Sequence, residues 1–171
     1  LRSVFFSMES AEWEFASSPI IHEGVVIVLC DVFKNSFIAA FEASTGKEIW
    51  KKERDEYPGW HTPNIYYDGE KCRVVVNGYQ HRGGYDFTTG EEIWRMVGGG
   101  DIPIPTPVVS GDLIYFNSAH GKDSPIYAIH TSVTGNITLE AEETSNTYVR
   151  WIIPRGGSYL QSLLVYGDYV Y

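Results

Sequence analysis

The stretch FEASTGKEIW, residues 41–50, returns as YDFTTGEEIW, residues 85–94, and this repetition decides the fold. The tryptophans that close the two copies, Trp50 and Trp94, are 44 residues apart (94 − 50). A repeat of about this length, with a Thr-Gly turn between two short apolar runs, is typical of small sheets in series, such as the four-stranded blades of a propeller. The sequence therefore predicts that each copy forms one turn and two strands.

The glycine and the tryptophan of each copy have separate roles. Gly46 and Gly90 follow a threonine, at the point where a tight hairpin needs a residue that tolerates positive φ. Trp50 and Trp94 offer a side chain large enough to bridge adjacent sheets, and an indole N–H that needs an acceptor. We therefore expect the glycines to shape the turns and the tryptophans to dock each blade on its neighbour.

The positions before each glycine complete the pattern. Ala40 and Gly84, six residues earlier, are small, which indicates close packing. Glu42 and Asp86, four residues earlier, suit hydrogen bonding to backbone N–H groups of the turn, a structural duty to which we attach no catalysis. The whole pattern resembles the tryptophan-docking motif, Ala-x-Asp-x-x-Thr-Gly-Lys-x-x-Trp, of the PQQ-like (quinoprotein) β-propeller repeat family.

The same spacing continues on both sides of the motif. Pro19, Pro63 and Pro107 recur at steps of 44 residues, each after Ser or Thr. Each proline should open the innermost strand of a blade, because the first residue of a strand need not donate to the ladder. Further upstream, Trp13 is expected to close a preceding blade.

The third repeat departs from the spacing. Leu139 stands where a docking tryptophan is expected, and the next candidate, Trp151, follows Trp94 by 57 residues (151 − 94). We therefore expect an insertion near residues 140–146, where acidic and polar side chains indicate a surface loop. The tail SLLVYGDYVY predicts the first two strands of another blade, with Ser162 at the proline position.

The predicted fold class is an all-β β-propeller of four-stranded antiparallel blades. We expect the end of one blade in residues 1–17, blades in residues 18–54, 62–98 and 106–154, and the start of another in residues 158–171. The family that the motif resembles contains larger rings, so we expect an open arc of about three to four blades. A small four-bladed ring is the alternative.

Composition limits the kinds of partner. The chain has 171 residues, of which 43% are hydrophobic and 15% aromatic, which indicates a folded, β-rich protein. The formal charge of −9 argues against nucleic acid, whose phosphates require clustered Lys and Arg. No apolar run reaches the roughly 18 residues of a membrane helix. Cys30 and Cys72 lack metal-ligand spacing, and we favour buried free thiols over a disulfide between blades.

Several side chains near strand ends are candidates for a binding face around the axial channel. They are Trp60, His61, His81, Arg82 and His120. The three histidines and Arg82 could form a polar binding surface, although we favour the interpretation that these four are ordinary solvated loop residues. The histidines lack the short spacing that places two imidazoles on one metal, so no metal site is predicted. No serine-hydrolase or phosphate-binding motif occurs, and we assign no catalytic residue.

The resemblance also implies a cofactor in some relatives. In PQQ-dependent alcohol dehydrogenases the quinone lies at the ring centre, stacked on a tryptophan, covered by a disulfide of adjacent cysteines and accompanied by calcium. This sequence has no adjacent cysteines. Trp60 could be such a stacking floor, but we favour an aromatic side chain that caps the channel. We expect PQQ and calcium to bind only in a complete ring and not to this segment alone.

Two hypotheses for function follow. The first is a non-catalytic propeller, similar to outer-membrane assembly lipoproteins, that acts as a binding or scaffolding module for a protein or small ligand. The second is a fragment of a PQQ-dependent alcohol or sugar dehydrogenase. The blade motif encodes architecture rather than chemistry, which favours the first. Resemblance alone implies a periplasmic or cell-surface location.

Overall fold

The computed structural model describes residues 16–98, 102–119 and 124–171, which form strands and turns without any helix. Sheet one contains four strands in sequence order: β1 (Ile20–His22), β2 (Val25–Cys30), β3 (Phe37–Glu42) and β4 (Glu48–Glu53). Sheet two repeats this order with β5 (Asn64–Asp68), β6 (Lys71–Val76), β7 (His81–Asp86) and β8 (Glu92–Val97). Their pairings are antiparallel, as the repeat predicts.

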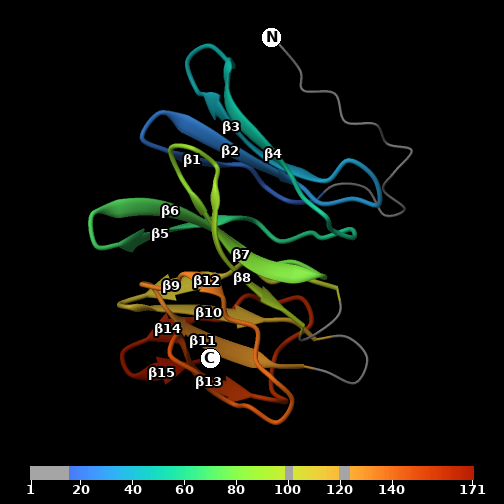
Figure 1. Ribbon diagram of the computed structural model, residues 1–171, viewed down its shortest axis with the longest axis vertical. Helices are drawn as coiled ribbons and strands as arrows, with labels where there is room; N and C mark the ends of the chain where they lie inside the picture. The colour runs from blue at the N-terminus through green and yellow to red at the C-terminus, as the bar shows by residue number, and fades with distance from the viewer. Residues whose placement is uncertain (1–15, 99–101, 120–123) are drawn as a thin grey trace.

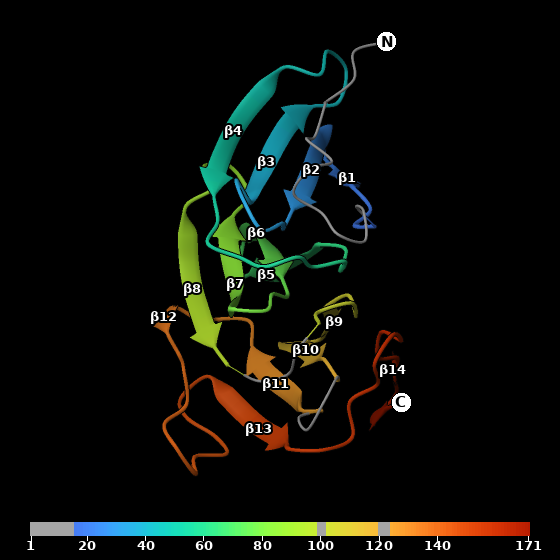
Figure 2. The same ribbon diagram turned by 90° about the vertical axis from the view of Figure 1, so that its right-hand side faces the viewer.

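Sheet three also contains four antiparallel strands: β9 (Val108–Ser110), β10 (Leu113–Asn117), β11 (Ile126–His130) and β13 (Val149–Ile153). A terminal hairpin follows, formed by β14 (Val165–Tyr166) and β15 (Tyr169–Val170). The three sheets succeed one another along the long axis (Figure 1). Figure 2 shows the first strand of each sheet, and β14, along one side and the last strands along the other. This is an open arc of propeller blades, and the predicted fold class is confirmed.

A ladder of hydroxyl groups links equivalent positions of successive sheets. The N–H of Ser18 donates to Thr62 Oγ1 at 3.3 Å, and the N–H of Thr62 donates to Thr106 Oγ1 at 3.4 Å. The N–H of Thr106 donates in turn to Ser162 Oγ at 3.0 Å. Ser162 therefore occupies the position before the proline, and Leu163 stands at the proline position, so the predicted alignment of the tail was wrong by one residue.

The prolines lie as expected, each directly before an innermost strand. Pro19 precedes β1, Pro63 precedes β5 and Pro107 precedes β9. At this place a missing N–H breaks no ladder hydrogen bond.

An element that the repeat did not predict lies just before the insertion. β12 (Gly135–Asn136) pairs in parallel with the outer strand β8, with Gly135 opposite Trp94. The N–H of Ile137 donates to the Arg95 carbonyl at 2.9 Å, and the N–H of Val97 donates to Thr138 Oγ1 at 3.0 Å. Sheet two therefore has a fifth strand that comes from the chain of sheet three. Residues 140–147 after it are mostly exposed, as expected of a surface loop.

The tryptophans of the motif lie in the cores between sheets. Trp50 is 8% exposed and packs with Ile27 of sheet one and Val74 of sheet two, and its indole N–H donates to the Phe87 carbonyl at 2.9 Å. Trp94 is 1% exposed and packs against Phe116 of sheet three. Its indole N–H stays within sheet two, where it donates to the Tyr66 hydroxyl at 2.9 Å.

Trp151 occupies the matching place on sheet three. It is partly buried against Leu163 and Val165 of the tail, and its ring centroid lies 6.0 Å from that of Tyr115. Trp13, the fourth tryptophan of the predicted set, lies outside the described residues. Cys30 and Cys72 are both free thiols, as favoured from the sequence, but only Cys30 is buried and Cys72 is half-buried.

The glycines of the motif adopt the conformation that their turns require. Gly46 has φ 72° and Gly90 has φ 73°. The expected close packing is present at Gly84, where a Cβ would lie 2.0 Å from Trp94 Nε1. Asp86 Oδ1 accepts the N–H groups of Thr88 and Thr89, the turn bonding predicted for it. Glu42 differs, because its carboxylate accepts the hydroxyl of Thr45.

Candidate functional site

Exposed aromatic side chains gather on the loops at one end of sheets one and two. Phe33 lies on the β2–β3 loop, Tyr57 on the β4–β5 loop and Tyr79 on the β6–β7 loop, and 51%, 47% and 40% of their surfaces are exposed. Large apolar rings on three separate loops seldom meet at a surface without a binding role. We call these three residues, with Trp60 and Ile102, the aromatic face.

Two hollows open on the aromatic face and share Trp60 and Ile102. The first hollow has a volume of about 380 Å³ and is lined by Ala16, Trp60, Ile102, Ile104 and Tyr159. The second hollow, also of about 380 Å³, is lined by Phe33, Tyr57, Pro58, Trp60, Tyr79 and Ile102. Concave sites of this size and apolar character are typical places for ligands and peptide side chains.

The exposed rings meet edge to face. The Phe33 and Tyr57 centroids are 6.1 Å apart with an interplanar angle of 63°, and those of Tyr57 and Tyr79 are 5.1 Å apart at 80°. Such pairs are favourable because the positive edge of one ring meets the negative face of the next. The cluster therefore forms ridges rather than one flat platform.

Ile102, which lines both hollows, has a strained backbone. Its φ is +51°, in a region that β-branched residues rarely adopt. Such strain costs about 1–3 kcal/mol and persists only where surrounding contacts enforce it, frequently at functional sites. The N–H of Trp60 donates to the Pro103 carbonyl at 3.1 Å, which ties the loop of Ile102 to the β4–β5 loop.

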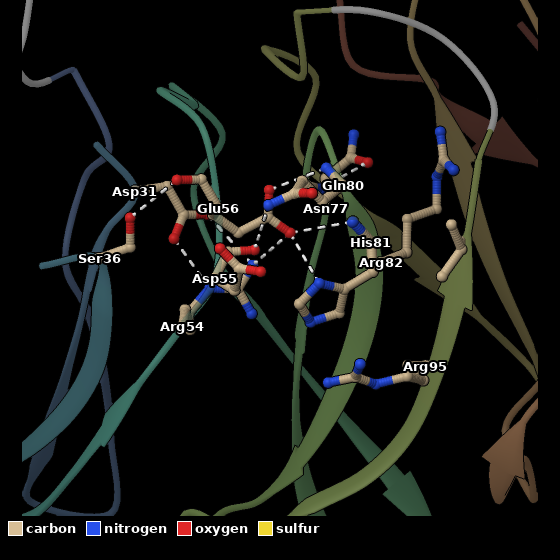
Figure 3. A network of polar contacts seen from close by, with 12 residues as sticks. Asp31, Ser36, Arg54, Asp55, Glu56, Asn77, Gln80, His81, Arg82 and Arg95 are labelled. Atoms are coloured by element: carbon tan, nitrogen blue, oxygen red, sulfur yellow. Dashed lines mark hydrogen bonds and ion pairs between the residues drawn. The ribbon is translucent and has the colours of Figure 1, made fainter. Parts of the chain in front are cut away.

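A buried polar network holds the aromatic loops from beneath (Figure 3). The Glu56 side chain is fully buried, and its carboxylate accepts the N–H groups of Gln80 and His81, each at 2.9 Å. It also contacts the His81 Nδ1 at 2.9 Å. Because Glu56 precedes Tyr57 and Gln80 follows Tyr79, this carboxylate fixes the two tyrosine loops to each other.

Arg54 extends the network to the loop of Phe33. Its guanidinium, fully buried, donates from Nε to Asp31 Oδ1 at 2.8 Å and from Nη2 to Asp31 Oδ2 at 3.2 Å. The Ser36 hydroxyl donates to the Val32 carbonyl at 2.6 Å and lies 3.2 Å from the Glu56 carbonyl. Charge-assisted bonds of this kind are strong in a dry interior, and breaking one partner leaves a costly unpaired charge.

The network sets opposite charges on Glu56 and His81. Burial raises the pKa of Glu56, but the hydrogen bond from His81 and the charge of Arg54 outweigh burial, so this pKa lies below its usual value. Burial is the largest single effect on the pKa of His81 and lowers it, but the bonds to Glu56 and to Glu92 (3.1 Å) together outweigh burial and raise this pKa overall. The protonated imidazole can donate to both carboxylates.

Asparagines repeat the position of Asp31 in the next two sheets. Asn77 and Asn117 are buried; Asn77 directly follows β6, and Asn117 is the last residue of β10. The Asn77 amide donates to the Pro105 carbonyl at 3.2 Å, and the Asn117 amide donates to the Gln161 carbonyl at 3.1 Å. Each side chain thus holds a loop between sheets on the same side of the arc.

The residues that the sequence singled out do not form one polar surface. Trp60 lies half-buried in both hollows. His61 is fully buried and His81 is 6% exposed, so the favoured interpretation as solvated loop residues was wrong for both. His81 is covered by the β4–β5 loop, whose Glu56 contacts its ring at 2.9 Å, and His61 is itself a residue of that loop. His120 lies outside the described residues.

Arg82 is also buried, contrary to the solvated interpretation. Its guanidinium donates to the Gly98 carbonyl and to Ser118 Oγ, and its Cζ lies 4.7 Å from the centre of the Tyr127 ring. Burial lowers the pKa of Arg82. Arg82 therefore joins sheet two to sheet three rather than facing a ligand.

His61 has an unusual environment beneath Trp60. Burial, followed by the charge of Arg54, lowers the pKa of His61 to about 3, although the Pro103 carbonyl favours its protonated form. Neither ring nitrogen has a hydrogen-bond partner of acceptable geometry among the described residues. His61 is therefore a neutral imidazole that packs as an apolar ring.

The donor set of the hollows does not fit the cofactor that the resemblance implies. PQQ is a planar quinone that carries carboxylates, whereas none of the described lining residues of the two hollows is cationic. No group of three or more His, Cys, Asp or Glu within residues 16–98, 102–119 and 124–171 could hold a metal ion. We therefore derive no redox step at this face.

Sequence reasoning missed most of the aromatic face and its support. Phe33, Tyr57 and Tyr79 fall in loops outside the repeated motif, and Asp31, Arg54 and Glu56 have no counterparts at fixed spacing. One signal was available: two tyrosines and a phenylalanine occur in polar loop segments, and large rings that gather at a surface indicate an interaction site.

These features define an open arc of β-propeller blades, and solved structures share this fold. A quinohemoprotein alcohol dehydrogenase from Comamonas testosteroni has 16% identity and a TM-score of 0.54, over 84% of this chain and 21% of its own. The quinohemoprotein alcohol dehydrogenase ADHIIG from Pseudomonas putida HK5 has 16% identity and a TM-score of 0.58, over 73% of this chain and 20% of its own. BamB from Moraxella catarrhalis has 15% identity and a TM-score of 0.48, over 81% of this chain and 36% of its own.

At these identities the likeness shows only that the fold is shared. The likeness to BamB, with a TM-score of 0.48, is too weak to support any conclusion. The chain spans about a fifth of the length of the two dehydrogenases. No family model matches the sequence, and no curated protein matches it. The described residues contain no helix that is long and apolar enough to cross a membrane.

Proposed function

We propose that this chain is part of a non-catalytic PQQ-like propeller that acts as a binding or scaffolding module through its aromatic face. One observation carries the proposal: three exposed rings on separate loops line one apolar hollow, and a buried ion-pair network holds these loops in place. A preorganised apolar surface favours binding because few loops and side chains must lose conformational freedom when a ligand binds.

The proposal can be tested with an apolar fluorescent dye, anilinonaphthalene sulfonate. The dye should bind the intact chain and should be released when Tyr57→Ala and Tyr79→Ala are combined. Tyr166→Ala is the matched control, because Tyr166 is 76% exposed on the terminal hairpin and lines neither hollow. If the double variant binds the dye as well as the unchanged protein does, a binding role for this face is contradicted.

A part of a PQQ-dependent alcohol or sugar dehydrogenase is the second candidate, because two solved structures that share this fold are quinohemoprotein alcohol dehydrogenases. Trp60 is the residue of the two hollows on which a planar quinone would have to stack, in a lining without a cationic partner for its carboxylates. Titration with PQQ and calcium, followed by Trp fluorescence, separates the two candidates. Stoichiometric binding that Trp60→Ala abolishes would favour the dehydrogenase; we expect none for this segment alone.

We also propose a periplasmic or cell-surface location and a protein or small-molecule partner rather than nucleic acid. The net charge of −9 supports the latter, because a phosphate backbone would be repelled. Fractionation of cells that express the parent gene would test the location.

A further inference from the structure

We infer that the aromatic face binds a short proline-rich segment of a partner protein in an extended conformation, with its basic residues near Asp55 and away from Lys34. This inference rests on the proposed binding function and names the chemistry of the partner. It starts from the shape of the second hollow, in which Phe33, Tyr57 and Tyr79 form successive edge-to-face ridges beside Pro58 and Trp60.

The ring geometry selects among apolar ligands. Planar ligands and sugars need an open ring face on which to stack, whereas here the interplanar angles of 63° and 80° turn neighbouring rings across each other. A ridged aromatic groove instead receives proline rings between the side chains. This is how aromatic-lined grooves recognise polyproline II segments, which lose little entropy on binding because they are already extended.

The size of the surface favours a segment over a folded partner. An aromatic side chain has a surface of about 150–250 Å², so three rings that are 40–51% exposed offer roughly 200–350 Å² together. A stable interface between folded proteins buries about 800 Å² on each partner. A second copy of this chain would therefore gain too little from the aromatic face alone, whereas a short peptide would cover it.

Charge orients the segment. The chain carries a net charge of −9, so a cationic partner is attracted at long range. Asp55 is exposed two residues before Tyr57, the middle ring of the three, whereas Lys34 is exposed next to Phe33 at one end. Basic residues of the partner should therefore lie near Asp55 and away from Lys34.

Fluorescence polarisation with a labelled oligoproline peptide that ends in two arginines tests the inference. We expect micromolar binding that weakens about tenfold or more in Tyr57→Ala and in Tyr79→Ala, each tenfold being about 1.4 kcal/mol. Tyr79→Phe should restore binding, because the ring rather than the hydroxyl makes the contact, and Tyr166→Ala should leave it unchanged. The same peptide with its prolines replaced by alanine should not bind.

The outcomes separate this inference from the proposed function. If the dye binds in a Tyr57-dependent and Tyr79-dependent manner but the peptide does not bind, the proline-rich partner is wrong and the binding face stands. If neither ligand depends on these tyrosines, both are wrong. Self-association that Tyr57→Ala abolishes in light scattering would assign the face to a second copy and would overturn the inference.

Discussion

The ring of Trp50 in sheet one lies directly against Gly90 in the turn of sheet two. A Cβ on Gly90 would come 2.5 Å from Trp50 Cε3, closer than real Cβ contacts allow. The indole N–H of the same tryptophan donates to the Phe87 carbonyl three residues before that glycine. The turn glycine of one blade thus makes room for the tryptophan of the preceding blade, in addition to its positive φ.

Gly90→Ala should destabilise the protein more than Gly46→Ala. Both glycines have nearly the same φ, 73° and 72°, so both variants bear a similar backbone strain of about 1 kcal/mol. Only Gly90 faces the Trp50 ring, whereas nothing lies within 4 Å of a Cβ at Gly46. Overpacking should add about 1–3 kcal/mol at Gly90. Urea unfolding measures the difference, and equal losses would contradict the contact.

Trp94→Ala should cost about 3–5 kcal/mol of unfolding free energy, because it removes a buried aromatic side chain and leaves a cavity. Trp94 is 1% exposed between sheets two and three. Trp60→Ala is the control, since Trp60 lies only half-buried at the hollows and should affect stability less. A melting temperature of Trp94→Ala equal to that of the wild type would show that this docking contributes little.

The buried network predicts a fall in stability on the alkaline side. His81 has a raised pKa in the folded state, so its contribution is fully present below the ordinary value of 6.5 and is lost as pH rises through the raised pKa. Glu56 has a lowered pKa, so its contribution is present above 4.5 and is lost as pH falls. The free energy of unfolding of His81→Gln, measured by urea titration across pH, should decline less steeply above pH 6.5 than that of the wild type.

For His81, the informative part of the curve of unfolding free energy against pH is its alkaline limb, above pH 6.5. His61 has a folded pKa of about 3, so it stabilises the fold above its ordinary value of 6.5 and its contribution fades as pH falls. It thus changes the acid limb together with Glu56. Parallel alkaline limbs in wild type and His81→Gln would contradict the role given to His81.

Thr106→Val should weaken the link between sheets two and three at the inner side of the arc. The Thr106 hydroxyl accepts the N–H of Thr62 at 3.4 Å, and valine keeps the shape of the side chain without this acceptor. The expected cost is about 1 kcal/mol. Thr147→Val, at an exposed position of the insertion, is the control. Thermal unfolding of the two variants should differ. Identical curves would show that the hydroxyl ladder makes no measurable contribution to stability.

The strands, turns and docking positions could be predicted because the motif encodes them locally. Three features act within a few residues of the chain: a glycine at positive φ, a proline before an innermost strand and a tryptophan at fixed spacing. Each of them occurs in both copies of the repeat. Trp50 and Gly90 show the same logic over a longer distance, since both belong to the repeated unit.

The aromatic face could not be predicted in the same way. The Glu56 carboxylate meets the N–H groups of Gln80 and His81 only after two loops of different sheets have come together. Charge and polarity alone suggested that His81 and Arg82 were solvated, yet the loops cover them. Burial of a polar group depends on partners far away in the sequence, and the pattern of one segment does not contain them.

The parallel pairing of β12 with β8 also couples the unfolding of two blades. Sheet three packs on the face of sheet two and, through β12, also occupies the edge of sheet two, so its opening exposes the amide hydrogens of β8. Sheet one has no such strand from its neighbour within the described residues. In hydrogen exchange, sheets two and three should therefore behave as one cooperative unit, with the Ile137 amide exchanging as slowly as the interior of β8, while sheet one opens by itself.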